Sequence, residues 1–455
     1  MNFFDKTIRL LGSIVWGPHM AVLLLGVGIY LTLRLKLVQV RYLGFSFRLL
    51  LGWKKTRESD QKASGDISSF QALSTSLAAV IGNGNIGGVC TAIAMGGPGA
   101  VFWMWVAAFF GMATKLVEAV LGQKFKITSS DGSVIGGPMY YISRGLKLPW
   151  LAGIFAFFMG CKPLFSTTTV QANSIALVLE KQLHIEPWIT GIGLAVLTWL
   201  VIIGGIKSIA RVTKFLSPLM VILYIGGALV TILIFSSKIP QAFVLIFTGA
   251  FKPSAVSGGI AGATVARAIR YGFSRGAYSN EAGTGTAAVF HATAKTSEPV
   301  RQGLIASLDV LFDTLIICTL TALTVLVSGA WTEGTSTGMT AAAFNAAIPQ
   351  AGGLIVTASS FLFGYSSLIA VPYYGEISFS YLLGNWVRLP FRWIFCVVIF
   401  IGAILTVESA WSIGDVFNGM MALTNLIGIA GLSGLAVASV KNYLDKIKMS
   451  KGGIL

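Results

Sequence analysis

Long apolar stretches separated by short polar loops run through almost the whole chain. An α-helix needs about 20 apolar residues to cross the hydrocarbon core of a bilayer, so each window of that length predicts a membrane helix. Eleven windows satisfy this rule, at approximately 20–37, 70–95, 100–122, 150–176, 189–205, 216–235, 256–273, 304–328, 353–383, 393–407 and 415–439. The pattern therefore predicts an all-α polytopic membrane protein with eleven transmembrane helices.

A glycine-rich run interrupts the second window, where an unbroken helix would be expected. The run reads Gly82-Asn83-Gly84-Asn85-Ile86-Gly87-Gly88. Irregular backbone at membrane depth leaves peptide groups unpaired, so it persists only where protein surrounds it or where it lines a wet cavity. The freed N–H groups that begin the second half-helix suit a carboxylate, and the freed C=O groups that end the first half suit a cation. The interruption therefore predicts a site for a substrate and an ion.

The same residues also match the dinucleotide-binding pattern Gly82-x-Gly84-x-x-Gly87. That pattern requires a preceding strand and an acidic residue about 20 positions later. The next acidic residue here is Glu118, and long apolar windows surround the run. The context therefore excludes a nucleotide-binding domain.

Two sets of five windows follow the first window, and each set opens on a glycine-rich interruption. In the second set the run covers residues 257–262, which predicts binding groups at Gly258, Gly259 and Gly262. The alternative is close helix packing, since Gly258 and Gly262 have the small-x-x-x-small spacing. Paired broken helices are typical of inverted-repeat transporters. The predicted organisation is an N-terminal lead-in, extra helix and cytoplasmic loop (1–67), a first repeat (68–235), an external connection (236–253), a second repeat (254–440) and a cytoplasmic tail (441–455).

Composition and charge agree with this class. Of the 455 residues 55% are hydrophobic and only 11% are charged, against about 25% charged in soluble proteins. The net charge of +16 would suggest nucleic acid as a partner of a soluble protein, but most Lys and Arg residues fall in one set of alternating loops. The positive-inside rule then predicts a multi-pass protein of the cell inner (plasma) membrane, with the lipid bilayer as partner, no nucleic acid, an external N-terminus and a cytoplasmic C-terminus.

The side chains give no support to an enzyme. No nucleophile and base fall in a recognisable arrangement, and His19, His184 and His291 lack metal-ligand spacing to another His or Cys. A channel and a binding receptor are the other classes, and neither has a sequence feature comparable to the two interruptions. We therefore expect a secondary transporter without a cofactor, in which an ion drives the substrate.

Several motifs resemble the alanine or glycine:cation symporter family of the amino acid-polyamine-cation superfamily. They are Gly84-Asn85-Ile86, residues 96–105, Gly111-Met112-Ala113-Thr114-Lys115, residues 136–141, 171–174, 204–209 and 275–283, Arg301-Gln302-Gly303 and residues 373–376. The resemblance extends over residues 16–433. It implies a fold of the leucine-transporter type, with a five-plus-five inverted repeat preceded by one extra N-terminal helix, and sodium-driven uptake of small neutral amino acids.

The resemblance also implies a substrate site at the first interruption. The substrate carboxylate would bind backbone N–H groups, and the ammonium group would bind carbonyl groups at both interruptions. Gln171 would donate or accept a hydrogen bond in the pocket, with hydrogen bonding between helices as the alternative for Gln171 and for Asn173. The implied substrate-binding residues are Val80, Asn83, Gly84, Asn85, Gln171, Gly258, Gly259 and Gly262.

For the coupling ion, the resemblance implies a sodium site of neutral oxygens. Its ligands would be the carbonyl groups of Ala78, Ile81 and Phe363 and the hydroxyl groups of Ser366 and Ser367. The alternative for the two serines is hydrogen bonding to carbonyl groups of their own helix. Neutral oxygens suffice for a hard cation, whereas proton coupling requires a group that titrates in the working range. Neither predicted broken segment contains a carboxylate, which favours sodium.

Lys162 departs from the family pattern, because it lies within an apolar window. A charged residue in such a segment is costly and usually faces a cavity or a partner. Some members of the superfamily resemble this arrangement in using a lysine amine in place of sodium, so a proton-coupled symporter using Lys162 is the alternative function. The other reading is that Lys162 extends to the cytoplasmic interface.

Two further departures concern the size of the pocket. Asn83 stands where the family usually has Thr, and Val371-Pro372 stands where it usually has Trp. Loss of an indole would leave more space, so we hypothesise that substrates larger than alanine, such as glutamine, are accepted.

Other charged residues are expected to pair. Lys115 and Glu118 have the i, i+3 spacing of a helical ion pair. Asp309 and Asp313 are predicted on one face of a helix near its cytoplasmic start, where a gate would pair them with Arg267, Arg270 or Arg275.

Overall fold

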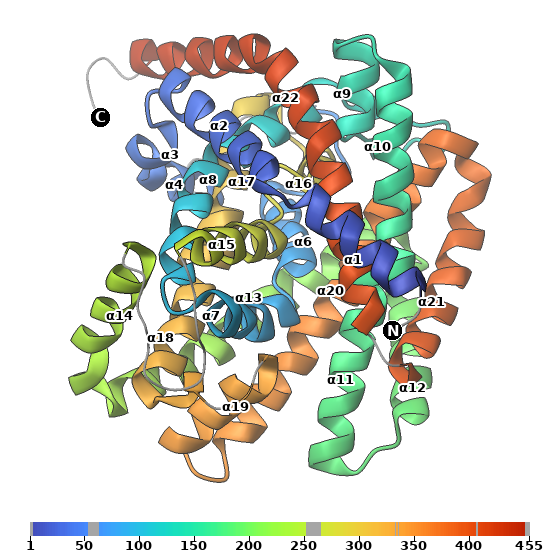
Figure 1. The fold of residues 1–455 in the computed structure, drawn as a ribbon. Coiled ribbons are helices and arrows are strands. Elements are labelled where there is room, and N and C mark those ends of the chain that lie inside the picture. Colours follow the sequence, from blue (N-terminus) through green and yellow to red (C-terminus); the bar gives the residue numbers. More distant parts are fainter. Residues whose placement is uncertain are drawn as a thin grey trace.

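Helices dominate the computed structural model, which describes residues 3–52, 63–251, 265–332, 334, 336–405 and 408–450 (Figure 1). In this described part, seven helical segments are long and apolar enough to cross a membrane: Ala100–Lys124, Pro149–Glu180, Gly205–Ile234, Pro299–Ser328, Gly352–Leu383, Asn385–Ile404 and Ser412–Met449. The bent pair Ser69–Val80 and Gly84–Gly96 adds an eighth. The all-helical membrane class is therefore confirmed.

The predicted count of eleven spans stays a prediction. Two predicted spans correspond to shorter apolar helices, His19–Arg34 and Pro187–Ile202. A third, at 256–273, overlaps residues outside the described ranges.

The first half of the chain supplies most of the short elements. It contains α1 (Phe3–Val15), α2 (Pro18–Arg34), α3 (Val38–Arg41), α4 (Leu43–Leu50), α6 (Ser69–Val80), η1 (Gly84–Gly88), α7 (Val89–Gly96), α8 (Ala100–Lys124), β1 (Ile127–Thr128), β2 (Val134–Ile135), α9 (Pro138–Gly145), α10 (Pro149–Lys162), η2 (Pro163–Thr167), α11 (Thr168–Leu183), α12 (Pro187–Ile202) and α13 (Gly205–Ile234). The two strands form an antiparallel hairpin in which Ile127 pairs with Ile135.

The second half contains the two longest helices of the described part, with 32 and 43 residues. It contains η3 (Ser236–Lys238), α14 (Ile239–Phe251), α15 (Val265–Asn280), α16 (Thr286–Ala292), α17 (Pro299–Val310), η4 (Leu311–Cys318), α18 (Thr319–Ser328), η5 (Ala330–Thr332), α19 (Ser336–Ala347), α20 (Gly352–Leu383), η6 (Asn385–Val387), α21 (Arg388–Ile404) and α22 (Glu408–Ser450).

The first predicted interruption is confirmed. Helix α6 begins with a capping box, in which the Ser68 side chain and Gln71 satisfy each other's backbone N–H groups. The helix ends at Val80, and Ile81 has an extended conformation, with φ −77° and ψ 101°. The chain then continues as the π-helix η1 and as α7, and the two halves are bent by 55°. The glycine-rich sequence therefore turns the chain inside the bundle.

A second interruption separates α15 from α16, at a place that the sequence analysis did not identify. Glu281, Gly283 and Gly285 have positive φ angles of 53°, 91° and 88°. Glycine adopts such angles without strain, so Gly283-x-Gly285 was the available signal. The predicted run with Gly258, Gly259 and Gly262 lies outside the described residues. The break between Asn280 and Thr286 is therefore the second interruption that the described part contains.

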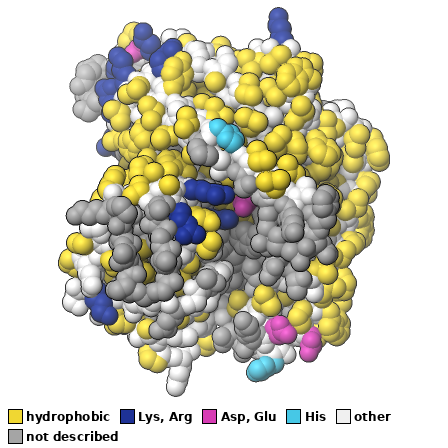
Figure 2. All heavy atoms as spheres, in the orientation of Figure 1, with side chains coloured by type: hydrophobic (Ala, Val, Ile, Leu, Met, Phe, Trp, Pro, Cys, Tyr) yellow, Lys and Arg dark blue, Asp and Glu magenta, His cyan; other side chains and the backbone are white. Residues whose placement is uncertain are grey.

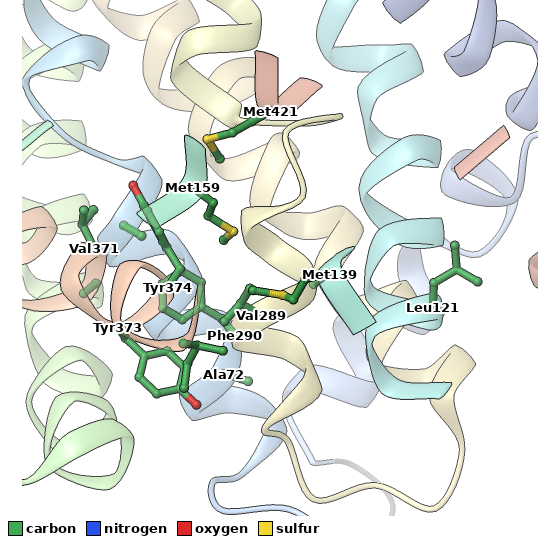
Figure 3. Close-up of a cluster of buried hydrophobic side chains, with 14 of the residues drawn as sticks. Ala72, Leu121, Met139, Met159, Val289, Phe290, Val371, Tyr373, Tyr374 and Met421 are labelled. Atoms are coloured by element: carbon green, nitrogen blue, oxygen red, sulfur yellow. The ribbon is translucent and has the colours of Figure 1, made fainter. Parts of the chain in front are cut away.

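A buried hydrophobic cluster lies where α20 meets α16 (Figure 3). Phe290 of α16 packs against Tyr373 and Tyr374 of α20, with ring centroids 6.0 and 6.1 Å apart. Met159 of α10 contributes to the same cluster. Val371 belongs to the pair Val371-Pro372 that stands where the family usually has Trp. It is also part of this cluster and is 1% exposed. This packing holds α20 against the second broken helix.

Hydrophobic side chains are widespread on the face of the molecule shown in Figure 2. Among the exposed residues of the described part, Phe215, Ile222 and Leu233 of α13 are each more than two-thirds exposed. A continuous exposed apolar surface would be unstable in water, and it is expected of a protein surrounded by lipid.

Candidate functional site

The five predicted ion ligands converge where α6 ends against α20. The Ser366 hydroxyl oxygen lies 3.2 Å from the Ala78 carbonyl oxygen and 3.4 Å from that of Ile81. It also lies 2.9 Å from the Phe363 carbonyl oxygen, which is 3.1 Å from the Ser367 hydroxyl oxygen. All five residues are buried. Because α6 ends at Val80 and Ile81 is extended, the last carbonyl groups of α6 lack helical partners, and those of Ala78 and Ile81 lie beside the Ser366 hydroxyl. The contacts of both serines with Phe363 are hydrogen bonds within α20.

This group of five residues, the oxygen cage, has a definite chemistry. It presents three carbonyl oxygens and two hydroxyl oxygens. Neutral oxygen ligands suit a hard cation, and a site without a carboxylate favours a single positive charge.

The predicted substrate residues Asn83 and Gln171 are in direct contact. The Gln171 side-chain oxygen accepts hydrogen bonds from the Asn83 backbone N–H at 3.2 Å and from its side-chain amide at 3.0 Å. Ser360 of α20 donates to the Asn83 side-chain oxygen at 2.6 Å. Gln171 thus joins α11 to the first interruption. In this arrangement it occupies the Asn83 N–H that was predicted to bind a carboxylate.

Asn85 connects the first interruption to the second broken helix. Its side-chain oxygen accepts from the Gly82 N–H at 3.0 Å, which fixes the orientation of the amide. Its amide nitrogen donates to Asp313 of η4 at 2.5 Å and to Ser279 of α15 at 3.1 Å. Its backbone carbonyl accepts from Thr321 at 2.9 Å. The sequence analysis anticipated only the backbone of Asn85, so Ser279 and Asp313 are newly placed beside the site.

The other predicted substrate residues are less informative. A Cβ atom placed on Gly84 would lie 3.6 Å from the ring of Tyr278, an ordinary contact distance, so space remains beside this residue. The Val80 side chain packs in a hydrophobic cluster with Leu77 and Tyr224. Asn173 donates to the Leu405 carbonyl at 2.8 Å, which is the hydrogen bond between helices considered as its alternative role.

Lys162 does not extend to the membrane interface, and that reading was wrong. The residue is 2% exposed and forms an ion pair with Glu281 at the second interruption. Glu281 also accepts a hydrogen bond from Thr286 at 2.7 Å. The ammonium group lies 5.6 Å from the centre of the Tyr374 ring. Burial is tolerated here because the opposite charge is in contact.

The predicted Lys115 and Glu118 ion pair is also wrong. The Lys115 ammonium donates to the Asn280 carbonyl at 2.6 Å and lies 3.7 Å from the Asp309 carboxylate. Glu118 accepts from the Gly285 N–H at 3.1 Å and from the Asn425 side chain at 2.8 Å. Both residues of α8 therefore hold the ends of the second interruption.

The expected gate between Asp309 or Asp313 and the arginines of α15 is likewise corrected. Asp309 contacts Lys115 and His291, and Asp313 accepts from Asn85 and Ser279. Arg275 lies 3.3 Å from Asp415 of α22 instead. The two aspartates are buried inside the bundle.

The loop after α8 is fastened by a separate polar network. Lys126 donates to the Ser64 carbonyl at 2.7 Å and to the Gln123 side chain at 2.8 Å. Burial lowers the pKa of Lys126 to about 8, although the nearby Asp66 charge acts in the opposite direction. In the hairpin, partial burial by itself would raise the pKa of Asp131. Hydrogen bonds from Ser133 and the charge of Arg388 outweigh that effect and lower the pKa.

Comparisons with known proteins agree with this geometry. Residues 1–453 match the model of the sodium:alanine symporter family. The chain is 43% identical to the sodium/alanine symporter AgcS of Methanococcus maripaludis over 97% of each chain. It is 36% identical to the probable sodium/glutamine symporter GlnT of Bacillus subtilis over 99% of this chain and 93% of that one.

A solved structure supports the fold. The structure of MhsT in complex with L-phenylalanine matches 83% of this chain and 98% of that chain, with a TM-score of 0.57 and 12% sequence identity. At this level of identity the likeness concerns the fold alone, which is of the leucine-transporter type. The family model covers nearly the whole chain. The two relatives, both named as symporters, match this chain over more than nine-tenths of their length. The chain therefore belongs to the sodium:alanine symporter family.

Proposed function

We propose that this protein is a sodium-coupled secondary symporter that imports small neutral amino acids such as alanine or glycine. The observation that carries the proposal is the oxygen cage around Ser366. In it, the Ala78 carbonyl oxygen and the Ser366 hydroxyl oxygen lie together although the two residues are 288 positions apart in sequence. Its ligands would be Ala78, Ile81, Phe363, Ser366 and Ser367. A cage of neutral oxygens beside a broken helix can hold sodium without any titration.

The substrate site would lie next to this cage at the first interruption. Gln171 would release the Asn83 N–H when a substrate carboxylate binds there. The ammonium group would bind carbonyl groups near Val80 and at the second broken helix. Because the cage and the substrate site share one interruption, binding of sodium would orient the backbone that binds the amino acid.

Transport would proceed by alternating access. The two interrupted helices would belong to two inverted five-helix repeats, residues 68–235 and 254–440, and the site would lie near the bilayer midplane. Placement of the basic loops supports an external N-terminus and a cytoplasmic C-terminus in the plasma membrane.

A proton-coupled symporter using Lys162 is the second candidate. The observation that favours it is the buried ion pair of Lys162 with Glu281, which lies at the second interruption. A lysine that lost its proton during the cycle would release Glu281 and so could move α16. Against this candidate, the charges of Lys162 and Glu281 already balance each other in the buried pair.

The first experiment separates these two candidates. Purified protein in liposomes is supplied with labelled alanine under an inward sodium gradient, or under an inward proton gradient without sodium. Accumulation only with sodium supports the oxygen cage. Accumulation with protons alone contradicts it and favours Lys162, and a channel would not accumulate alanine above equilibrium under either gradient.

The substrate range needs its own test. GlnT, a relative of similar length, carries the name of a sodium/glutamine symporter. Val371 lies in the core cluster, so any extra space would result from repacking around it rather than from direct contact with the substrate. Labelled alanine uptake should be competed by a series from glycine to glutamine, and competition by only the smallest members would contradict a wider pocket.

A further inference from the structure

A polar cavity of about 180 Å³ lies between α1, α15 and α22, outside the site described above. A single water molecule needs roughly 10–15 Å³, so the cavity admits a small solute. Three charged side chains line it, those of Arg270 and Arg275 of α15 and Asp415 of α22, together with Trp16 and Tyr271. Figure 2 shows basic and acidic side chains close together near the middle of the face, over α15. The function proposed above gives none of these residues a role.

Asp415 has unused capacity to accept hydrogen bonds. Its Oδ2 atom forms one contact with the Arg275 guanidinium, at 3.3 Å, which is longer than the roughly 2.7–2.9 Å of a strong charge-assisted hydrogen bond. Its Oδ1 atom is buried without a hydrogen-bond partner in the part of the chain that the structure describes. Buried polar atoms are nearly always paired, and a carboxylate accepts up to about four hydrogen bonds. A cationic group of a ligand therefore fits beside this carboxylate.

The N-terminal segment fixes the position of this carboxylate. The Trp16 indole N–H donates to the Asp415 backbone carbonyl at 2.7 Å, and the Trp16 side chain is 8% exposed. One helical turn further along α22, a Cβ atom on Gly419 would overlap the Val15 side chain, so α22 packs directly against the end of α1. The N-terminal segment therefore forms one wall of the cavity.

The charges of the cavity match those of a neutral amino acid. The described lining residues carry two guanidinium groups and one carboxylate, and so have one excess positive charge. A guanidinium group binds a carboxylate through two parallel N–H donors, and a carboxylate binds an ammonium group. Arg270 is exposed, and the side chains of Arg275 and Asp415 are 15% and 21% exposed, so a solute can reach all three. An amino acid with both charged groups is therefore a better match than a simple anion or cation.

One aromatic ring connects the cavity to the first interruption. The Arg275 guanidinium lies 5.7 Å from the centre of the Tyr278 ring, within the range of a cation–π contact. The same ring lies beside Gly84, since a Cβ atom placed on Gly84 would be 3.6 Å from it. A group that binds Arg275 is thus separated from the predicted substrate residue Gly84 by a single side chain.

We propose that this cavity is a second amino-acid site, where the substrate binds before it reaches the first interruption. Arg270 and Arg275 bind its carboxylate, Asp415 binds its ammonium group, and α1 closes the site on one side. This assignment rests on the proposed function, since the ligand is the amino acid that the protein would transport. Binding of the substrate replaces the contact of Arg275 with Asp415, and a movement of Arg275 changes the packing of Tyr278 beside Gly84. The cavity thus collects the substrate and prepares its path to the first interruption.

The direct test measures binding rather than uptake. Gly82→Ala obstructs the site at the first interruption, so labelled alanine that still binds to the purified full-length variant in sodium reports on the cavity. Adding Asp415→Asn should weaken this remaining binding by about tenfold or more, because one charge-assisted contact is lost. Unlabelled alanine should compete, whereas lactate, which lacks the ammonium group, and alaninamide, which lacks the carboxylate, should compete far less.

The native protein gives the same count without Gly82→Ala. The binding assay should find two alanine molecules per native chain and one per chain of Asp415→Asn. Absence of binding to a folded Gly82→Ala variant, or binding that Asp415→Asn leaves unchanged, overturns the second site.

Uptake gives the second readout. Asp415→Asn and Arg270→Gln should each raise the KM for alanine several-fold and leave the half-saturating sodium concentration nearly unchanged. Arg267→Gln is the matched control, because it removes the same charge from α15 at a residue that is not among the described lining residues. An equal rise in KM for Arg267→Gln would reveal a long-range charge effect and overturn the site. Asp415-dependent binding without any uptake would instead contradict the proposed function and leave the second site standing.

Discussion

The hydroxyl oxygen of Ser366 lies 3.2 Å from the carbonyl oxygen of Ala78, and this contact joins an unbroken helix, α20, to the end of a broken one, α6. A hydroxyl at this position can donate to the carbonyl group or accept a cation together with it. In the sodium site proposed above, replacement of this hydrogen bond by coordination of the ion would link ion binding to the position of α6.

Ser366→Ala should weaken sodium binding without removing the substrate site. Loss of one cage oxygen is expected to raise the half-saturating sodium concentration by about tenfold or more, equivalent to about 1.4 kcal/mol. Initial rates of alanine uptake at a series of sodium concentrations measure this value.

Ser378→Ala is the matched control for that experiment. Ser378 is a buried serine of the same helix whose hydroxyl bonds to the Tyr374 carbonyl at 2.7 Å, away from the cage. An equal change in sodium dependence for both variants would contradict a specific role of Ser366.

Gly82→Ala should abolish most uptake. A Cβ atom there would lie 2.7 Å from the Gln171 side-chain nitrogen and 2.9 Å from the Ser367 hydroxyl, so both groups would have to move. Because one belongs to the predicted substrate site and the other to the cage, both affinities should fall. Gly88→Ala should be tolerated, since no atom outside the neighbouring backbone of its own helix lies within 4 Å of its added Cβ. Similar uptake by the two variants would show that the space at Gly82 is unimportant.

Lys162→Met should destabilise the protein strongly. The change leaves Glu281 as a buried charge without the lysine, and breaking a buried ion pair in this way costs about 3–5 kcal/mol. Thermal unfolding in detergent should show a large drop in Tm. The double variant Lys162→Met with Glu281→Gln should recover much of the loss, because neither buried charge then remains.

The same double variant separates structure from coupling. If Lys162 serves only to balance Glu281, the recovered protein should still accumulate alanine with sodium. Loss of accumulation together with a normal Tm would argue for a direct role of the pair in transport.

Lys126 predicts a pH dependence of stability with a definite sign. In the folded protein its pKa is lowered to about 8, whereas an unfolded lysine titrates at about 10.4. Between these values the unfolded state binds more protons, so the contribution of this group to stability rises with pH. The Tm of the native protein relative to Lys126→Gln should therefore increase from about pH 8 to pH 10. The same comparison with Lys124→Gln, an exposed neighbour, is the control, and a decrease for Lys126→Gln alone would contradict the sign.

Local chemistry made the first interruption predictable. Residues 82–88 interrupt an apolar window, and the glycines in this run disfavour a regular helix. The second interruption was missed because its glycines, Gly283 and Gly285, lie in a polar segment outside the windows. A search for apolar windows cannot detect a break whose flanking helices are short and partly charged, as α15 is.

The residues of the oxygen cage could be selected from the sequence together with the family resemblance, but their distances could not. Sequence and resemblance selected Ala78, Ile81, Phe363, Ser366 and Ser367, and the structure brings all five into one place. Their distances depend on the packing of α20 against the end of α6, which no local pattern encodes.

The sequence alone determined that this chain is a helical membrane protein and that a helix breaks within its apolar part. These properties follow from hydropathy and chain length, because the bilayer imposes the same requirement on every segment that crosses it. Tertiary structure decided the partners of the buried charges. Lys115 binds Asn280 and Asp309 rather than Glu118, and Lys162 binds Glu281, because a buried charge pairs with whichever opposite group the packing of distant helices brings to it.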